Sequence, residues 1–289
     1  MKRNRQTFAY ALTTPAVLVL LLLSVFPLLY TIRYSFTDCY LLSRQPAGWV
    51  GLSNYINIFK DSFFWKVLKN TLFFTIFGVT IETTLGIALA VFADSFTRGK
   101  KLLRILLMLP MLLPPVTVAL VWQTMFSNNN GILNQILAAV HLGKVNWLQD
   151  VHTALPAILV IDIWQYTPLA FLLAYASLQT VSQQQYEAAA LDGANRWRMF
   201  CNITMPNILN GVRMVVLLRV IDTFRLFDKV NILTKGGPAN STATITQYIY
   251  QYGTKNFQIG YASAASMIMT VIVVAMSAVY LKQSLKEMI

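Results

Sequence analysis

The sequence predicts an all-α fold: a polytopic membrane helix bundle with six transmembrane helices and one polar helical hairpin. The first two observations are that 56% of the 289 residues are hydrophobic and that only 12% are charged. A soluble domain carries roughly 25% charged residues. The third observation is that six apolar stretches reach the ~20 residues that a helix needs to cross a bilayer. We therefore treat residues 1–289 as a single transmembrane domain.

The first apolar stretch covers residues 12–32 and follows a short basic segment. A secretory signal has a similar order, but its apolar part is shorter and is followed by a small-residue cleavage site. We therefore expect an uncleaved first span. Residues 33–69 then leave the membrane. The rings in this segment, which are typical of a membrane interface, are those of Trp49, Tyr55, Phe63, Phe64 and Trp65.

The second and third spans are residues 71–93 and 105–126. Glu82, inside the second span, is either packed against a partner helix or functional. The prolines of the third span are Pro110, Pro114 and Pro115. Because proline removes a backbone donor, we expect these residues to kink one continuous span.

The remaining spans are residues 154–176, 212–233 and 259–281. The last of them contains Gly260 and Ala264, small residues that let helices approach closely in lipid. These three segments complete the predicted bundle of six.

The fifth span is unusual because it holds five charged residues. They are Arg219, Asp222, Arg225, Asp228 and Lys229. At about 2.5–3.5 kcal/mol each at a helix centre, they cannot all face lipid. Opposite charges three residues apart can pair along one helix, which lowers the cost. We expect this span to face the bundle interior or a water-filled cavity. Its ion pairs either lock the packing or line a solute path.

Six spans place both termini on the same side of the membrane. Twelve Lys and Arg residues lie on that side and eight on the other, so the positive-inside rule makes the termini cytoplasmic. The net charge of +12 is not a nucleic-acid footprint, because the basic residues alternate with apolar runs. Cys39 and Cys201 fall on opposite sides and so cannot form a disulfide.

A polar segment, residues 182–206, lies between the fourth and fifth spans. Good helix formers continue to Leu191, and Gly193 is expected to end that helix because glycine accepts the backbone angles of a sharp turn. Asn195 can cap a second short helix, which should end where Pro206 removes a backbone donor. The segment is thus predicted to form a helix, a tight turn and a second helix on the cytoplasmic side.

The residues of this hairpin, EAAALDGANRWRMFCNITMP, resemble the EAA loop of permease subunits of binding-protein-dependent ABC importers. The matching positions are Glu187, Ala188, Ala189, Asp192, Gly193, Ala194, Phe200, Ile203 and Pro206. The departure is Met205, where leucine is usual, and this change conserves volume. The resemblance implies a coupling helix that docks into a cleft of an ATPase subunit. An ordinary helical hairpin is the alternative.

Two shorter patterns, residues 50–55 and residues 64–71, resemble the maltose, glycerol-phosphate and multiple-sugar permeases, as the larger-subunit-like member of the pair. Residues 164–171 and 222–238 resemble the stretches that build the sugar site at the membrane midplane in this family. Carried over by position, this resemblance points to Asp162, Tyr166, Leu169, Asp222, Thr223 and Leu226, with Arg225 beside them. Where the family commonly has amides and aromatics, this chain has Asp222 and Arg225, so a charged sugar derivative stays open.

The resemblance implies a permease subunit of an ATP-driven importer for a sugar, an oligosaccharide or a sugar derivative, working by alternating access in the bacterial cytoplasmic membrane. The implied partners are a second homologous permease, expected to be a distinct chain, an ABC ATPase dimer and a solute-binding protein, periplasmic or lipid-anchored. Membrane lipid surrounds the chain, and no nucleic acid is expected.

The sequence shows no Walker A loop, no HExxH and no catalytic triad, so the chain is not expected to be an enzyme. No catalytic residue, metal ligand or cofactor is assigned to it; ATP and magnesium would belong to the ATPase. Two alternatives remain. One is a permease for amino acids, polyamines or phosphate. The other is an ion-coupled secondary transporter with Glu82, Asp162 and Asp222 as a proton relay.

Overall fold

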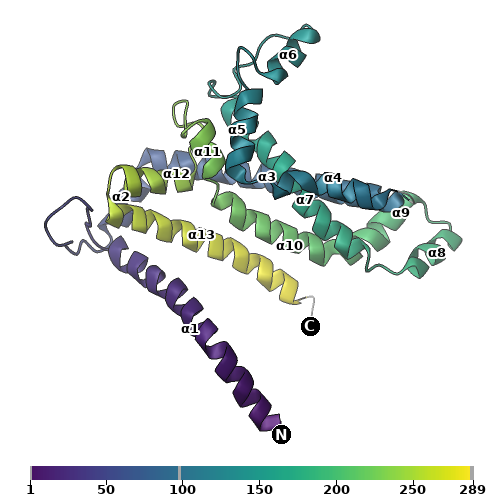
Figure 1. The fold of residues 1–289 in the computed structure, drawn as a ribbon, viewed down its shortest axis with the longest axis horizontal. Helices are drawn as coiled ribbons and strands as arrows, with labels where there is room; N and C mark the ends of the chain where they lie inside the picture. Colours follow the sequence, from purple (N-terminus) through teal and green to yellow (C-terminus); the bar gives the residue numbers. More distant parts are fainter. Residues whose placement is uncertain (1, 97–98, 287–289) are drawn as a thin grey trace. The chain divides into compact units, whose positions relative to one another are not determined.

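The computed structural model describes residues 2–96 and 99–286, and each regular element within them is a helix (Figure 1). The chain forms two compact units, Met1–Ser62 with Tyr248–Val271, and Phe63–Gln247 with Ile272–Ile289. Within the described residues, five helices are long and apolar enough to cross a membrane, or six if one bent pair counts as a single span. The predicted all-α membrane bundle is therefore confirmed.

The first unit contains α1 (Lys2–Ser35), α2 (Ser53–Lys60), η2 (Gln251–Lys255) and the start of α13 (Ile259–Lys286). The predicted first span lies inside α1. The start of α13 packs closely on the chain after α1, because the Gly260 N–H donates to the Cys39 carbonyl at 3.0 Å. A Cβ at Gly260 would overlap the Thr37 carbonyl oxygen, so this contact requires glycine.

A tyrosine cluster holds the end of α2 in the same unit. Asp61 Oδ2 accepts hydrogen bonds from the Tyr248 hydroxyl at 2.8 Å and from the Tyr252 hydroxyl at 3.3 Å. Burial, followed by the charge of Asp61, raises the pKa of Tyr252 to about 12. Burial, followed by the charge of Asp38, also raises the pKa of the Cys39 thiol, which makes that thiol a poor nucleophile at neutral pH.

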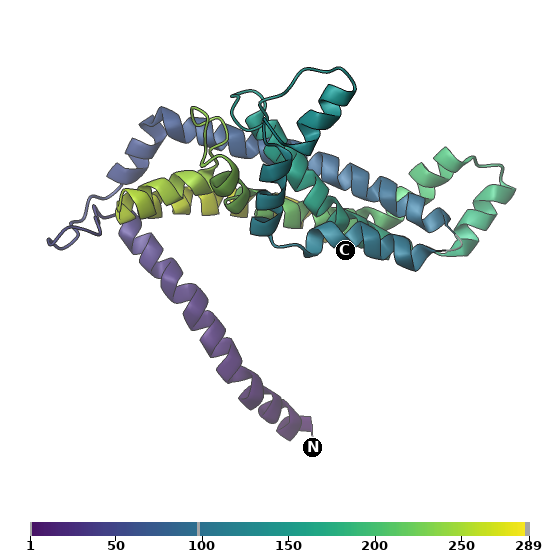
Figure 2. The same cartoon turned by 45° about the horizontal axis from the view of Figure 1, so that its top comes forward.

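The second unit is built on a bundle of α3 (Ser62–Ser95), α4 (Lys100–Leu112), α7 (Ala154–Leu178) and α10 (Met205–Phe224), which lie side by side in both views (Figures 1 and 2). Small residues bring these helices together. A Cβ at Gly86 of α3 would overlap Ala170 of α7, and a Cβ at Gly211 of α10 would overlap the Ser177 hydroxyl. Close backbone approach of this kind is how helices gain packing energy in lipid.

The predicted third span is not one kinked helix. It is divided into α4 and α5 (Pro115–Met125), whose axes differ by 92° (Figure 2). Leu113 and Pro114 are extended, because proline disfavours helical angles in the residue before it and two prolines follow each other here. A further helix, α6 (Ile132–Ala139), follows α5. The kink expected over residues 105–126 is therefore a complete break between two helices.

The predicted fifth span, residues 212–233, is also broken. Helix α10 ends at Phe224, and α11 (Asp228–Leu233) begins after a three-residue gap. In this gap, the Leu226 carbonyl accepts from the hydroxyls of Thr244, at 2.8 Å, and Thr246, at 2.5 Å. These side chains satisfy a carbonyl that the helix would otherwise use, so the break costs little even inside a membrane.

The hairpin consists of α8 (Gln183–Leu191), α9 (Arg196–Met199) and the π-helical turn η1 (Phe200–Thr204), which runs directly into α10. The second helix was expected to end at Pro206. Instead, Pro206 lies in the first turn of α10. The Met205 N–H reaches back to the Phe200 carbonyl, five residues earlier. This wider turn accommodates the missing donor of Pro206.

Candidate functional site

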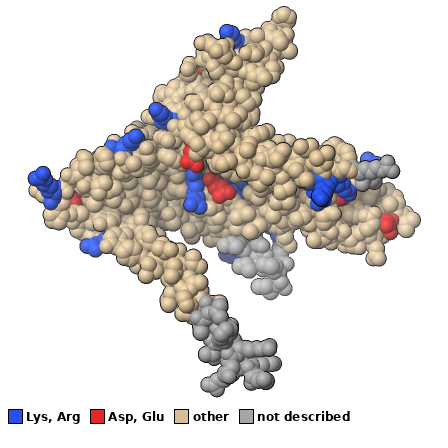
Figure 3. Space-filling view, in the orientation of Figure 1, with Lys and Arg blue, Asp and Glu red and all other residues tan. Residues whose placement is uncertain are grey.

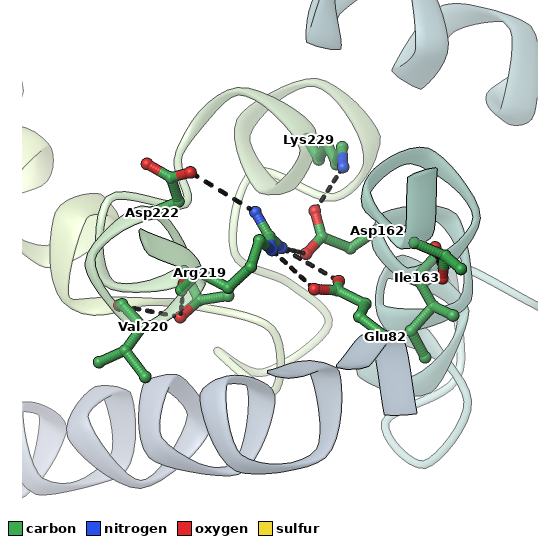
Figure 4. Close-up of polar contacts among 9 residues, drawn as sticks. Glu82, Asp162, Ile163, Arg219, Val220, Asp222 and Lys229 are labelled. Carbon is green, nitrogen blue, oxygen red and sulfur yellow. Dashed lines mark hydrogen bonds and ion pairs between the residues drawn. The ribbon is translucent and has the colours of Figure 1, made fainter. Parts of the chain in front are cut away.

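A cluster of buried charges lies where α3, α7, α10 and α11 meet, with Arg219 at its centre (Figure 4). Its guanidinium binds Glu82 through two hydrogen bonds, from Nε at 2.6 Å and from Nη2 at 3.0 Å. Nη2 also donates to Asp162 Oδ2 at 2.6 Å. On the other side, Nη1 lies 3.8 Å from Asp222 Oδ2. A planar guanidinium fork suits this two-sided arrangement.

Lys229 joins the cluster from the first turn of α11. Its ammonium group donates to Asp162 Oδ1, so both oxygens of Asp162 are bonded to basic groups. The ring of Tyr166, one turn further along α7, lies under both cations. Its centroid is 4.0 Å from Arg219 Cζ and 4.6 Å from Lys229 Nζ. Such cation–π contacts add to the ion pairs when the groups are shielded from water.

The four innermost members balance in charge, with the acids Glu82 and Asp162 against the bases Arg219 and Lys229. Each has at most 2% of its surface exposed. Isolated charges at such depth would be very costly, and mutual pairing removes most of that cost. The cluster therefore fixes the broken end of α10 and the start of α11 against α3 and α7.

This geometry separates the residues predicted to line a solute path into two groups. Asp162 and Thr223 are buried. The Asp162 carboxylate is bonded to two cations, and the Thr223 hydroxyl donates to the Arg219 carbonyl at 2.9 Å. Asp222 and Arg225 are exposed, whereas Tyr166, Leu169 and Leu226 are half-buried. Of the predicted path, the second group is thus the part that solvent reaches.

The cavity beside the cluster is small. Its volume is about 80 Å³, and its walls include Tyr166, Asp222 and Arg225. Ligand pockets typically measure about 300–1,000 Å³, so this cavity has room for water and not for a sugar. The face drawn in Figure 3 is largely uncharged, with acidic and basic side chains together near its middle.

The hairpin is a second candidate site, and its turn has the predicted geometry. Gly193 has a φ of +76°, in the region that favours glycine. Its N–H donates to the Ala190 carbonyl at 3.1 Å, and the Ala194 N–H donates to the Ala189 carbonyl at 2.9 Å. These two bonds form a Schellman motif. The Asn195 side chain caps α9 by accepting from the Arg198 N–H at 2.8 Å.

The hairpin presents large apolar side chains to the exterior of the chain. Leu191 is 90% exposed and Trp197 is 70% exposed, with Trp197 stacked on Phe200. Glu187, Ala188, Asp192 and Pro206 are also exposed, and Ala189, Ala194 and Phe200 are half-buried. Within the hairpin, α8 is tied to η1 by a hydrogen bond between the hydroxyls of Tyr186 and Thr204, at 2.9 Å.

The principal partners of Arg219 and Lys229 were not predicted from the sequence. The charges of the fifth span were expected to pair along one helix, and of those pairs the described residues form Arg219 with Asp222. The principal partners, Glu82 and Asp162, come from two other helices. One signal for this pairing was present in the sequence. Glu82 and Asp162 are each the only acidic residue of an apolar span, and a buried base needs an acid as its partner.

Residues 82–284 match the family model described as binding-protein-dependent transport system inner membrane component. The chain is 34% identical to a probable ABC transporter permease protein, y4oQ, of Sinorhizobium fredii, over 96% of this chain and 90% of the relative. It is 32% identical to the trehalose/maltose transport system permease protein MalF of Thermococcus litoralis, over 98% and 95% of the two chains.

Two further similarities agree with these. The chain is 31% identical to the sulfoquinovosyl glycerol transport system permease protein SmoG of Agrobacterium fabrum, over 95% of this chain and 89% of the relative. Its fold matches a crystal structure of a bacterial ABC transporter involved in the import of the acidic polysaccharide alginate, with a TM-score of 0.87 at 23% identity, over 98% and 96% of the two chains. The chain therefore belongs to the family of inner membrane components of binding-protein-dependent transport systems, as ABC importer permeases.

Proposed function

We propose that this chain forms half of the solute path in an ATP-driven sugar importer and carries the motion of an ATPase into the membrane. The exposed hairpin carries this proposal. Leu191 and Trp197 would be costly to leave in water, and a partner cleft that accepts an apolar helix end would bury them. The proposed partners are an ABC ATPase dimer, a second permease chain and an extracytoplasmic solute-binding protein.

The link from the hairpin to the charge cluster is one continuous stretch of helix. The backbone is helical from Arg196 through η1 to the end of α10. At about 1.5 Å per residue, the path from Trp197 to Arg219 is about 33 Å long, which is close to the thickness of a bilayer core. A displacement of the hairpin would thus move Arg219 and Asp222 as one body. With the hairpin on the cytoplasmic side, both termini are cytoplasmic as well.

The proposed solute class rests on the relatives, two of which are named for the transport of trehalose/maltose and of sulfoquinovosyl glycerol. Alternating access explains the small size of the cavity at the cluster, since a closed state leaves no room for solute. The proposed contacts of the solute are Tyr166, Asp222 and Arg225, which are exposed or half-buried.

The test is solute uptake by the whole importer in proteoliposomes, with binding protein outside and ATP inside. Uptake of labelled trehalose or maltose should stop without ATP and continue when an ionophore removes the proton gradient. Uptake that collapses with the ionophore at constant ATP would instead support the ion-coupled transporter. ATP-dependent uptake of amino acids or phosphate, with none of sugars, would contradict the proposed solute class.

A further inference from the structure

A second and larger cavity lies at the opposite end of α11 from the charge cluster. Its volume is about 760 Å³, within the range of about 300–1,000 Å³ typical of ligand pockets. It is formed by the end of α5, the loops on either side of α6, and the turn after α11. We call it the amide pocket; its polar and aromatic lining includes Gln123, Phe126, Asn128, Asn129, Gln149 and Thr234.

The chemistry of this lining differs from that of the cluster. The described residues that line the amide pocket bear no ionisable side chain, and four of them are amides. Amides donate and accept hydrogen bonds at once, which suits the hydroxyls of a sugar. A pocket for a charged solute would instead contain a fixed opposite charge.

The walls are held in place by contacts behind the lining. The Asn128 amide donates to Gln149 Oε1 at 3.1 Å, which joins the two loops across the pocket. This bond uses one of two N–H donors of Asn128, so each amide has further capacity for a ligand. Phe126 is flanked by Trp122 and Trp147, with ring centroids 5.4 Å away on each side. On the opposite wall, the hydroxyls of Thr234 and Thr242 share a hydrogen bond of 2.7 Å.

The position of the amide pocket is the one expected of an entrance for the solute. Helix α11 carries Lys229 of the cluster at its start and Leu233 of the amide pocket at its end, so the two cavities are separated by the length of this helix, about 9 Å. Figure 1 shows α5 and α11 away from the α8 and α9 hairpin. If the hairpin faces the cytoplasm, the amide pocket lies toward the outside.

We infer that the amide pocket is an entry site for a neutral saccharide, which is held by its amides before it passes along α11 to the charge cluster. This inference rests on the proposed sugar importer and narrows its solute to an uncharged one. It also assigns the first contact with the solute to loop residues that lie outside the predicted fourth and fifth spans.

The test is saturation-transfer NMR on the whole transporter complex in nanodiscs without binding protein, with trehalose and maltose as neutral probes and an unsaturated diuronate disaccharide as the acidic probe. The neutral sugars should show transfer, and the diuronate should show none. Asn128→Leu with Gln149→Leu should weaken neutral binding about tenfold, which corresponds to about 1.4 kcal/mol. The matched control is Asn146→Leu, which removes an exposed amide from the loop that also holds Gln149. This variant should bind the neutral sugars as the parent does.

A second variant avoids the risk that the double variant fails to fold. In a chain with Cys39→Ser and Cys201→Ser, Asn129→Cys should react with a methanethiosulfonate reagent more slowly when trehalose is present. Asn146→Cys should react at an unchanged rate. Equal binding by parent and double variant, no protection of Asn129→Cys, or tighter binding of the diuronate would overturn the inference. A parent complex that shows ATP-driven uptake of other solutes and none of sugars would instead contradict the proposed function.

Discussion

The charge cluster predicts a specific failure of additivity between two substitutions, Arg219→Met and Glu82→Gln. The buried part of the cluster has two acids and two bases, which sum to zero. Arg219→Met leaves two acids with one base, a net charge of −1. Glu82→Gln leaves one acid with two bases, a net charge of +1. The double variant returns to zero, with Asp162 still paired to Lys229.

The magnitude follows from the burial of the groups. Removing one partner of a buried ion pair costs about 3–5 kcal/mol, because the other charge is left without compensation. For a chain of this size that corresponds to a fall in melting temperature of roughly 10 °C, at about 2–4 °C per kcal/mol. The double variant should be more stable than Arg219→Met alone, because Asp162 and Lys229 remain as a balanced pair. With single losses of about 3–5 kcal/mol, this result requires a coupling energy above the ~0.5–3 kcal/mol that is usual for residues in contact.

The assay is thermal unfolding of the detergent-solubilised complex, followed by intrinsic tryptophan fluorescence. Arg225→Met is the matched control, because Arg225 is an exposed arginine just beyond the end of the same helix, and its loss should change stability by less than about 0.5 kcal/mol. If the two substitutions were additive, or if the double variant were the least stable, the ion pairs would not be what holds α10 against α3 and α7.

Three further predictions concern the hairpin, the solute path and the first unit. Gly193→Val should uncouple ATP hydrolysis from uptake, since valine pays about 1–2 kcal/mol for a left-handed backbone. A Cβ meets nothing within 4 Å at Gly193 or at Gly143, so normal coupling in both Gly193→Val and the control Gly143→Val would refute a role for the turn. Asp222→Ala should slow uptake while ATP hydrolysis and assembly stay measurable. The Asp222 side chain is 51% exposed, so its removal costs little stability. Unchanged uptake kinetics would show that Asp222 serves helix packing only. Because the pKa of Tyr252 is raised to about 12 from about 10, the unfolded chain loses its proton first, and the stabilisation present below pH 10 is lost as the pH rises toward 12. In that window the melting temperature should fall more steeply with rising pH for the parent than for Tyr252→Phe. Equal slopes for the two proteins would contradict the raised pKa of Tyr252.

Local signals were enough to predict the hairpin. Gly193 and Asn195 act through hydrogen bonds to residues within five positions, so their roles follow from residue type and spacing. The apolar stretches likewise locate the long helices, because a bilayer sets their minimum length.

The breaks and the cluster depend on contacts between distant residues. The Leu226 carbonyl is satisfied by Thr244 and Thr246, and the guanidinium of Arg219 by Glu82 and Asp162, 137 and 57 positions away. Nothing in the local pattern of residues 212–233 indicates these partners. The pair Pro114–Pro115 did indicate a bend, but its size depends on α5 packing against α11, which a single segment does not show.

The most direct test of the central claim is to purify the chain from its native membrane through a C-terminal tag and to identify what accompanies it. The account predicts an ABC ATPase and a second six-span permease, both retained by the parent. Leu191→Asp, which places a charge on the exposed end of α8, should lose the ATPase and keep the second permease. A parent chain recovered alone, in a detergent that preserves such complexes, would contradict the account.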